Sequence, residues 1–386
     1  MSAVTVSFDG QAMRLDTRQD AEVICQKLKG VEVRSLILQG NTFGIDAAQR
    51  IGEELRQQKF LREAHFKDIF TSRGKTEVPI ALEHLLNGIS QSGTELKLLD
   101  LSDNAIGPIG APSVDKFLRT KAASKIEKLY LNNCGMGPEG GSSISVPVSE
   151  LRLKEFIWGR NRLENKGARF MFAALSCMKS LEVVKMPQNG MNVPGITSIV
   201  QALMYNISTI REIDFSDNTI KTKGAEALEK VILGANNLEV LKLDDCLLKN
   251  EGFSVICDAI SKSKAPETLK FASFEGNELQ GDKIVDLISI TFKDCRQGFR
   301  LSLLDNEFSR AELERLNTLS SEMEDNFTID VDDPNDLDYQ DEEDDDDEDN
   351  SEDESQDDEE GCQDDDGDCQ ENDDSCLSFA RLSVAN

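Results

Sequence analysis

Few residues of this chain have the types and spacing that catalysis requires. Only two histidines occur, His65 and His84, and neither lies near cysteines or another histidine at metal-ligand spacing. The sequence contains no GxxxxGKS/T phosphate loop, no GxSxG nucleophile turn and no HExxH zinc motif. We therefore expect the chain to hold no cofactor and no metal of its own. Any effect on chemistry must then come from the surface that it offers to a partner.

Five polar side chains are candidates for contacting such a partner, because each lies shortly after an apolar segment. They are Arg73, Lys75, Asn133, Arg160 and Arg162. Arg73 and Lys75 belong to the stretch Phe70–Pro79, which lengthens one interval of a repeating pattern. A cation in an anonymous loop is most often only solvated, and the same holds for the other three residues. Their roles therefore depend on the elements that position them.

An apolar pattern recurs ten times between residues 33 and 306. Each copy reads apolar, two variable residues, apolar, one variable residue, apolar, two variable residues, and then usually Asn or Cys. Leu96, Leu99, Leu101 and Asn104 form one such copy. The last positions are Asn41, Ile69, Asn104, Cys134, Asn161, Asn189, Asn218, Cys246, Asn277 and Asn306. Most intervals are 27–31 residues, which is typical of the longer leucine-rich repeats, but one interval is 35.

These repeats predict an α/β fold, a leucine-rich-repeat solenoid shaped as a ribonuclease-inhibitor-like horseshoe with a parallel sheet on its concave face. The apolar–x–apolar step is typical of a strand with one buried side, and a helix-spaced apolar stretch such as residues 193–203 follows. No single unit buries its apolar face, so the units must stack. Asn or Cys at the last position can satisfy backbone groups of a buried turn. Residues 1–329 would form this domain, with residues 1–30 and 307–328 covering its ends.

The last segment, residues 330–386, has a different composition. Residues 330–374 contain 28 acidic residues and no lysine or arginine, and they account for most of the formal net charge of -31. Such a segment buries too little apolar surface to fold, so we expect a disordered acidic tail. It can be a solvating tail, or it can attract a basic partner at low salt. Because the tail repels phosphate and the remainder is nearly neutral, nucleic acid is not an expected partner.

The sequence does not indicate secretion or a membrane partner. The nine cysteines form no CxxC pair, and an odd, unpatterned set is typical of reduced thiols inside the cell. The first residues lack the pattern of a signal peptide, and no apolar run approaches the roughly 18 residues of a membrane span. We therefore expect a cytoplasmic protein.

Several segments between the apolar positions carry polar residues that generic leucine-rich repeats do not share. They are Gly40–Thr42, Asp68–Arg73, Leu101–Ala105, Leu129–Asn133, Gly159–Asn165 and Asp245–Leu248. In these segments, and over about residues 1–330 together with the acidic tail, the chain resembles the Ran GTPase-activating proteins of nuclear transport.

This resemblance implies a protein that binds the GTP-bound form of a Ran-type small GTPase along one edge and the concave rim of the horseshoe. Asn133 matches the asparagine that orients the catalytic glutamine of the GTPase. Arg73 matches an arginine that serves docking and loop order rather than acting as an arginine finger. The further residues expected to contact the partner are Lys75, Asn104, Arg160 and Arg162.

The resemblance also implies an activator that stimulates hydrolysis in the active site of its partner and is not itself an enzyme. GTP and magnesium would belong to the GTPase, and a Ran-binding protein would join in a ternary complex. The chain would be a monomer, located in the cytoplasm with a perinuclear fraction.

Two other classes of protein share part of the pattern. Acidic leucine-rich proteins that bind histones combine a small repeat domain with an acidic tail, but their repeats are shorter and fewer. A scaffold like ribonuclease inhibitor shares the repeat length, but it leaves the tail and the loop at Arg73 without a role.

Overall fold

A computed structural model describes residues 3–322 and 327–335 of the chain. The predicted disordered tail, including residues 336–386, lies almost wholly outside the described residues. Residues 1–332 form one compact unit, and the description below concerns this unit alone.

The strands of the described residues form one long parallel sheet, in which β1 pairs with β3, β3 with β5, and every later strand with its successor through β14. The strands are β1 Val4–Ser7, β3 Val33–Ile37, β5 Glu63–His65, β6 Leu98–Asp100, β7 Lys128–Tyr130, β8 Glu155–Ile157, β9 Val183–Lys185, β10 Glu212–Asp214, β11 Val240–Lys242, β12 Phe271–Ser273, β13 Phe299–Ser302 and β14 Phe327–Asp330. A separate pair joins β2, Arg14–Leu15, to β4, Thr42–Phe43. The register places equivalent repeat positions side by side, so Leu129 lies level with Leu99 and with Phe156.

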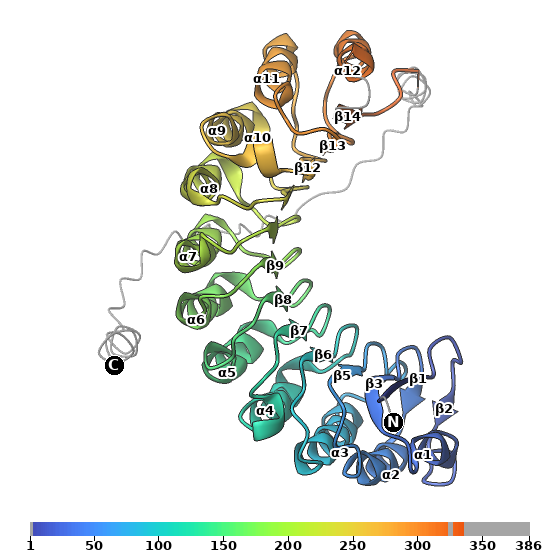
Figure 1. The fold of residues 1–386 in the computed structure, drawn as a ribbon. Coiled ribbons are helices and arrows are strands. Elements are labelled where there is room, and N and C mark those ends of the chain that lie inside the picture. The colour runs from blue at the N-terminus through green and yellow to red at the C-terminus, as the bar shows by residue number, and fades with distance from the viewer. Residues whose placement is uncertain (1–2, 323–326, 336–386) are drawn as a thin grey trace, which may run out of the picture. The chain divides into compact units, whose positions relative to one another are not determined.

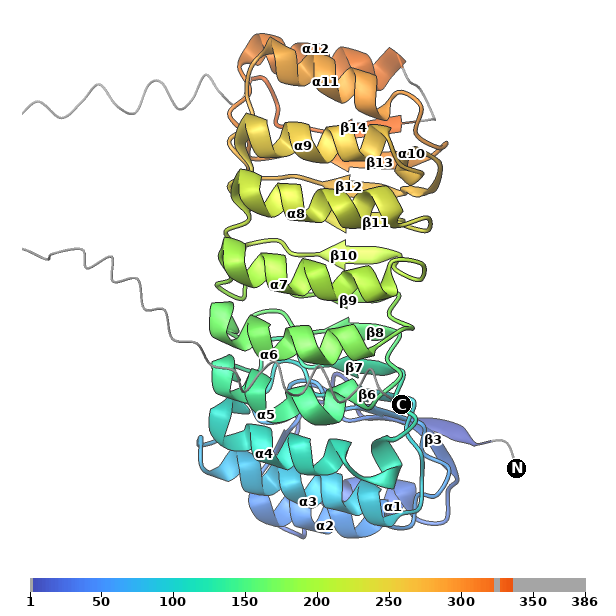
Figure 2. The ribbon, with the colours of Figure 1, turned by 90° about the vertical axis from the view of Figure 1, so that its left-hand side faces the viewer.

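The helices cover the convex face of the sheet, and together the two layers curve into an arc (Figures 1 and 2). They are α1 Glu22–Leu28, α2 Ile45–Leu55, α3 Glu77–Gln91, α4 Gly107–Leu118, α5 Gly137–Ser149, α6 Glu164–Cys177, α7 Val193–Leu203, α8 Lys221–Gly234, α9 Lys249–Ser261, α10 Ala265–Thr268, α11 Asp282–Phe292 and α12 Arg310–Glu322. The predicted leucine-rich-repeat solenoid with a concave parallel sheet is confirmed.

The repeated apolar positions form the core between the two layers. Leu96, Leu99 and Leu101 are fully buried, and the weakest copy of the pattern buries Leu61, Ala64 and Phe66 in the same positions. Burying one large aliphatic side chain contributes about 1.5–3 kcal/mol, so a ladder of three per repeat supplies the force that stacks the units.

The asparagines at the last pattern position are buried, except Asn306, which is half-buried. We call the set Asn41, Asn104, Asn161, Asn189, Asn218, Asn277 and Asn306 the asparagine ladder. The amide nitrogen of Asn189 donates to the carbonyl oxygens of Trp158 at 2.6 Å and Met186 at 3.1 Å. Its amide oxygen accepts the backbone N–H groups of Asn161 at 3.2 Å and Leu163 at 3.3 Å. The side chain therefore links neighbouring turns and satisfies buried backbone groups, as predicted.

Both ends of the solenoid extend the sheet rather than only covering it. β1 pairs with β3, and β14 pairs with β13. At the C-terminal end, the rings of Phe299 and Phe327 stack with centroids 5.4 Å apart, and Phe292 stacks on Phe299 at the same separation. The predicted caps are thus strand–helix units themselves, and the compact unit runs to Asp332.

The long repeat interval places its extra residues between β5 and α3. This connection comprises residues 66–76, whereas residues 101–106 make the equivalent connection in the next repeat. The loop ends earlier than predicted, because α3 begins at Glu77 and includes Pro79. The stretch that contains Arg73 and Lys75 is therefore a genuine loop at the sheet edge.

Candidate partner-binding site

At the carboxyl end of the strands, the residue before each last pattern position has left-handed backbone geometry. We call these residues the rim column: Gly40, Asp68, Asp103, Asn133, Arg160, Gln188, Asp217, Asp245, Gly276 and Asp305, with φ between 48° and 70°. Asp and Asn tolerate this conformation better than most side chains do, whereas Arg160 and Gln188 adopt it against their preference. The column runs along one edge of the sheet, because the strands are parallel and in register.

The rim column is held by a continuation of the sheet hydrogen bonds. The backbone N–H of Asp103 donates to the carbonyl of Asn132 at 2.8 Å. In the next repeat, the N–H of Asn133 donates to the carbonyl of Gly159 at 2.8 Å. Neighbouring strands lie about 4.8 Å apart, so successive rim side chains start at fixed, short separations.

Asn133 presents an exposed side chain in the middle of this column. Its amide nitrogen donates to Oδ1 of Asp103 at 2.9 Å, and Oδ2 of Asp103 lies 2.9 Å from Nζ of Lys67. Burial works against the charge on Asp103, but the hydrogen bonds from Lys67 and Asn133 outweigh it and lower the pKa of this carboxyl. The hydrogen bond to Asp103 raises the pKa of Lys67 in turn. The amide of Asn133 is therefore tied to an ionised carboxylate.

Arg160 and Arg162 follow in the repeat after Asn133, and both side chains are exposed. Both residues have φ of 53°. Nε of Arg160 donates to Oε1 of Gln188, its neighbour in the rim column. Arg162 has no ion pair among the described residues. The two arginines and Asn133 thus occupy adjacent loops on one edge of the sheet.

Arg73 is a clamp rather than a solvated cation, since its side chain is only 5% exposed. Its Nε donates to the hydroxyl of Thr42 at 2.9 Å, and Nη2 donates to the Thr42 carbonyl at 3.0 Å and reaches the Leu15 carbonyl at 3.4 Å. Its Nη1 pairs with Asp16 and lies 3.6 Å from Glu77. Hydrogen bonding to Arg73, followed by that to Arg14, lowers the pKa of Asp16.

The clamp joins the loop of residues 66–76 to the small β2–β4 pair. The hydroxyl of Thr42 also donates to the carbonyl of Thr71 at 2.7 Å, so one threonine contacts the loop at two points. Lys75 lies two residues beyond Arg73 with an exposed side chain and no ion pair among the described residues. The loop is thus fixed at Arg73 and leaves Lys75 available at its surface.

Asn104 does not fit the predicted role of a partner contact. Its side chain is 1% exposed, and its amide nitrogen donates to the carbonyls of Phe66 and Leu101, each at 2.8 Å. Its amide oxygen accepts the N–H of Ile69 at 2.9 Å. The prediction for Asn104 was wrong because this residue belongs to the asparagine ladder, one position inside the rim column.

Several residues that shape the site were not singled out from the sequence. Asp103 and Lys67 hold Asn133, while Asp16 and Thr42 hold Arg73. Aligning the repeats would have found Asp103, because it occupies the position of Asn133 one repeat earlier. No comparable signal marks Asp16, which lies 57 residues from Arg73 in the sequence.

The C-terminal half of the rim column carries only acidic charges, whereas the N-terminal half combines Asp68 and Asp103 with Arg160. Beyond Gln188, the column continues with Asp217, Asp245, Gly276 and Asp305. Burial, followed by repulsion from the carboxylates of Asp217 and Asp244, raises the pKa of Asp245. The exposed cations near Asn133 thus belong to the N-terminal half.

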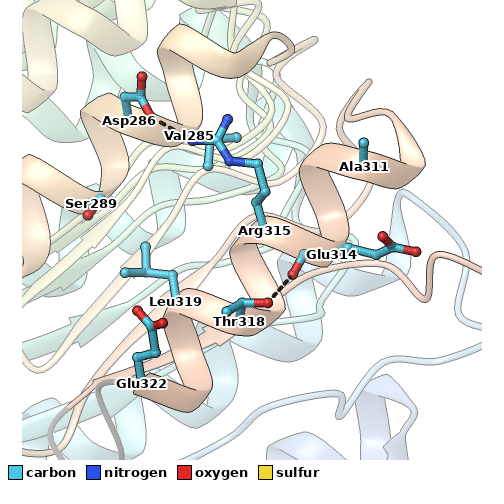
Figure 3. Close-up of a pocket in the computed structure, with 9 residues that line it drawn as sticks. All are labelled: Val285, Asp286, Ser289, Ala311, Glu314, Arg315, Thr318, Leu319 and Glu322. Atoms are coloured by element: carbon cyan, nitrogen blue, oxygen red, sulfur yellow. Dashed lines mark hydrogen bonds and ion pairs between the residues drawn. The ribbon is translucent and has the colours of Figure 1, made fainter.

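A surface cleft lies between α11 and α12, far along the chain from Asn133 (Figure 3). Val285 and Leu319 line it, and Arg315 crosses it to reach Asp286 at 2.6 Å. Because Arg315 is paired with both Asp282 and Asp286, it is not a free cation for an anionic ligand in the cleft. In the described part of the chain, no group of three or more His, Cys, Asp or Glu residues is placed to hold a metal ion. No helix among the described residues is long and apolar enough to cross a membrane.

Comparison with known proteins gives a consistent set of relatives. A family model described as a leucine-rich repeat matches residues 94–112, 122–145 and 206–228. The Ran GTPase-activating protein 1 of Xenopus laevis is 40% identical over 199 residues, which cover 48% of this chain and 34% of that protein. The Ran GTPase-activating protein 1 of Saccharomyces cerevisiae is 31% identical over 295 residues, which cover 72% of each chain.

The solved structures add evidence on the fold alone. The crystal structure of the Rad7 and Elc1 complex in yeast aligns with a TM-score of 0.55 at 12% identity, covering 85% of this chain and 73% of that chain. In the sequence comparison with the animal Ran GTPase-activating proteins, the matched region covers only 21% to 36% of the length of those proteins.

Proposed function

Because this chain belongs to the Ran GTPase-activating protein family, we propose that it binds a Ran-type small GTPase in its GTP form and accelerates GTP hydrolysis. The partner would contact the edge of the horseshoe that carries the loops at Arg73, Asn133 and Arg160. Asn133 would touch the catalytic glutamine of the GTPase and hold it where it orients the attacking water. Lys75, Arg160 and Arg162 would pair with acidic groups of the partner.

The contrast between Asn133 and Arg73 carries this proposal. Asn133 is exposed at the rim, and its amide is fixed by Asp103. Arg73 is 5% exposed and fully engaged by Thr42, Leu15 and Asp16, so it cannot reach a nucleotide in another protein without breaking the clamp. The arrangement supports activation by positioning, with Arg73 ordering a docking loop.

The magnitude of such an effect is consistent with positioning. For Ras, an activator supplies about 10⁵-fold acceleration, which corresponds to about 7 kcal/mol of barrier. One neutral amide cannot stabilise that much developing charge directly. It can restrict a glutamine that the GTPase already has, and exclusion of water at the interface strengthens the other interactions.

In this proposal the chain is not itself an enzyme, and it contributes no nucleotide, metal or nucleophile. GTP and magnesium belong to the partner. A Ran-binding protein bound elsewhere on the GTPase would complete a ternary complex, and one copy of this chain would suffice as a monomer. A cytoplasmic location with a perinuclear fraction would expose the GTPase to this activity outside the nucleus.

Single-turnover hydrolysis of GTP by purified Ran, with the full chain in excess, tests the proposal. We expect the wild-type chain to accelerate hydrolysis and Asn133→Ala to lose most of the acceleration, about 10²-fold or more. Asp217→Ala, three repeats away in the same column, is the matched control and should keep the wild-type rate. A wild-type chain without effect on Ran would refute the proposal, and a pull-down that captured histones but no GTPase would favour the acidic histone-binding class instead.

A further inference from the structure

We propose that Asp103 and Lys67 are positioning residues that fix the orientation of the Asn133 side-chain amide, so that its oxygen faces the partner. The inference rests on the proposed function of Asn133 and adds two residues that act through it. They come from consecutive repeats, since Lys67 follows β5, Asp103 follows β6 and Asn133 follows β7.

The chemistry of a carboxylate gives this arrangement its direction. An amide side chain has a donating end and an accepting end of nearly the same shape, and it can turn over unless its surroundings distinguish them. An ionised carboxylate only accepts hydrogen bonds. Because Oδ1 of Asp103 lies 2.9 Å from the amide nitrogen, the NH₂ end of Asn133 must face the preceding repeat. The oxygen of Asn133 accepts no hydrogen bond within the described residues, and the side chain is exposed, so this oxygen is available to a partner.

Lys67 keeps Asp103 in the required charge state and orientation. Its Nζ lies 2.9 Å from the carboxylate oxygen that Asn133 does not use, so the two oxygens of Asp103 are engaged by two different repeats. The Asp103 side chain is 28% exposed, which leaves these contacts only partly screened by water. The positive charge of Arg160 acts on Asp103 in the same direction.

The backbone beneath the three side chains is held as well. Asp68, the residue after Lys67, donates its N–H to the carbonyl of Ser102 at 2.9 Å. Asp103 and Asn133 donate theirs to the following repeat at 2.8 Å each. A fixed backbone and a fixed amide together mean that little freedom is lost when a partner binds.

The orientation selects the kind of group that can bind. An outward amide oxygen accepts a hydrogen bond from an N–H donor and repels a carboxylate. The NH₂ group of a glutamine fits this requirement, and once it donates to Asn133 its own carbonyl oxygen is directed away and remains available for water. The structure thus assigns Asn133 to the accepting side of an amide–amide contact.

Asp103→Asn tests the assignment, because the new amide has the same shape but can donate as well as accept. Asn133 could then turn over, and we expect the maximal single-turnover rate with Ran to fall about tenfold, equivalent to about 1.4 kcal/mol, at an unchanged half-saturating concentration. Lys67→Met should lower the maximal rate in the same way by about threefold. Asp217→Asn removes the same charge from the same column in a distant repeat, and it should match the wild type.

A double-mutant cycle separates positioning from other roles. In an Asn133→Ala background, Asp103→Asn should have no further effect on the maximal rate, because its influence passes through Asn133. Additive losses would overturn the inference, and so would a change confined to the half-saturating concentration. Thermal unfolding of each variant shows whether it is folded. If Asp103→Asn does not fold, Lys67→Met carries the same cycle.

The outcome is distinguishable from failure of the proposed function. A wild-type chain that does not accelerate hydrolysis refutes the function itself. An active wild type that depends on Asn133 but keeps its full rate in Asp103→Asn refutes only the positioning role.

Discussion

Replacing Arg73 with lysine separates the two ways in which an arginine at this position can contribute. Lysine keeps a positive charge near Asp16, but it lacks the planar fork that reaches both the hydroxyl and the carbonyl of Thr42. If charge alone matters, the variant should behave as the wild type. If Arg73 orders the loop of residues 66–76, the variant should loosen it.

The size of the effect follows from the contacts. Two hydrogen bonds from the guanidinium, at 2.9 and 3.0 Å, have good geometry, while the contact with Leu15 at 3.4 Å is too long to add much. Each hydrogen bond from a charged donor contributes about 1.5–3 kcal/mol. A lysine can recover about one of these hydrogen bonds. Its attraction to the half-exposed Asp16 carboxylate is screened by water. We therefore expect the loop to lose about 2 kcal/mol, or a factor of about 30 in its opening equilibrium.

Hydrogen exchange at backbone amides measures this opening directly. The N–H of Phe43 donates to the carbonyl of Ile69 at 3.1 Å, and the N–H of Gly44 donates to that of Leu15 at 2.8 Å. Both amides should exchange about 30-fold faster in Arg73→Lys, whereas the amide of Asp217 in a distant repeat should not change. Lys75→Ala, an exposed cation in the same loop, serves as the control.

Two results would refute the reasoning. Unchanged exchange at Phe43 and Gly44 in Arg73→Lys would show that the fork does not order the loop. Faster exchange with a fully retained rate of hydrolysis would show that loop order has no part in activation. Thr42→Val removes the shared hydroxyl without touching the cation, and it should reproduce the faster exchange to a smaller extent.

Two further predictions concern the scaffold. Asn189→Ala leaves buried backbone groups of two turns without partners and should lower the free energy of unfolding in urea by about 4 kcal/mol. Asn133→Ala on the exposed rim should lower it by only about 1 kcal/mol, because alanine tolerates the left-handed backbone less well than asparagine does. Equal losses would contradict the division between ladder and rim. At pH 8, iodoacetamide should modify the exposed Cys177 and spare Cys134 and Cys246, because burial raises the pKa of both thiols. Peptide mapping by mass spectrometry measures this, and rapid labelling of Cys134 in the native protein would count against the buried thiol.

The architecture was predictable because a single requirement repeats along the chain. Every unit must bury the same three apolar positions, so the period of the ladder fixes the strands, the helices and their parallel order. The strands of the terminal units could not be predicted in this way. β1 and β14 lack the full pattern, and their place in the sheet follows from pairing with β3 and β13 rather than from local sequence.

The site was only partly predictable, and Asn104 and Asn133 show why. Both are asparagines near the end of a strand, but Asn133 precedes the interior Cys134, whereas Asn104 is itself the interior residue. A shift of one residue along the turn moves a side chain from the rim to the core. The repeat alignment contains this information. The burial of Arg73 is different, because its partners lie 31 and 57 residues away and no local pattern connects them.

A stacked scaffold also explains why no catalytic motif appears in the sequence. The rim side chains nearest Asn133 in space come from neighbouring repeats, such as Asp103 and Arg160, which lie 30 and 27 residues away in the chain. Strand pairing brings them to about 4.8 Å per repeat, so a functional surface can be assembled from one residue in each of several units. Substituting one rim residue should therefore alter the contribution of rim residues in adjacent repeats more than that of residues next to it in the sequence. The double-mutant cycle of Asp103 and Asn133 measures this coupling.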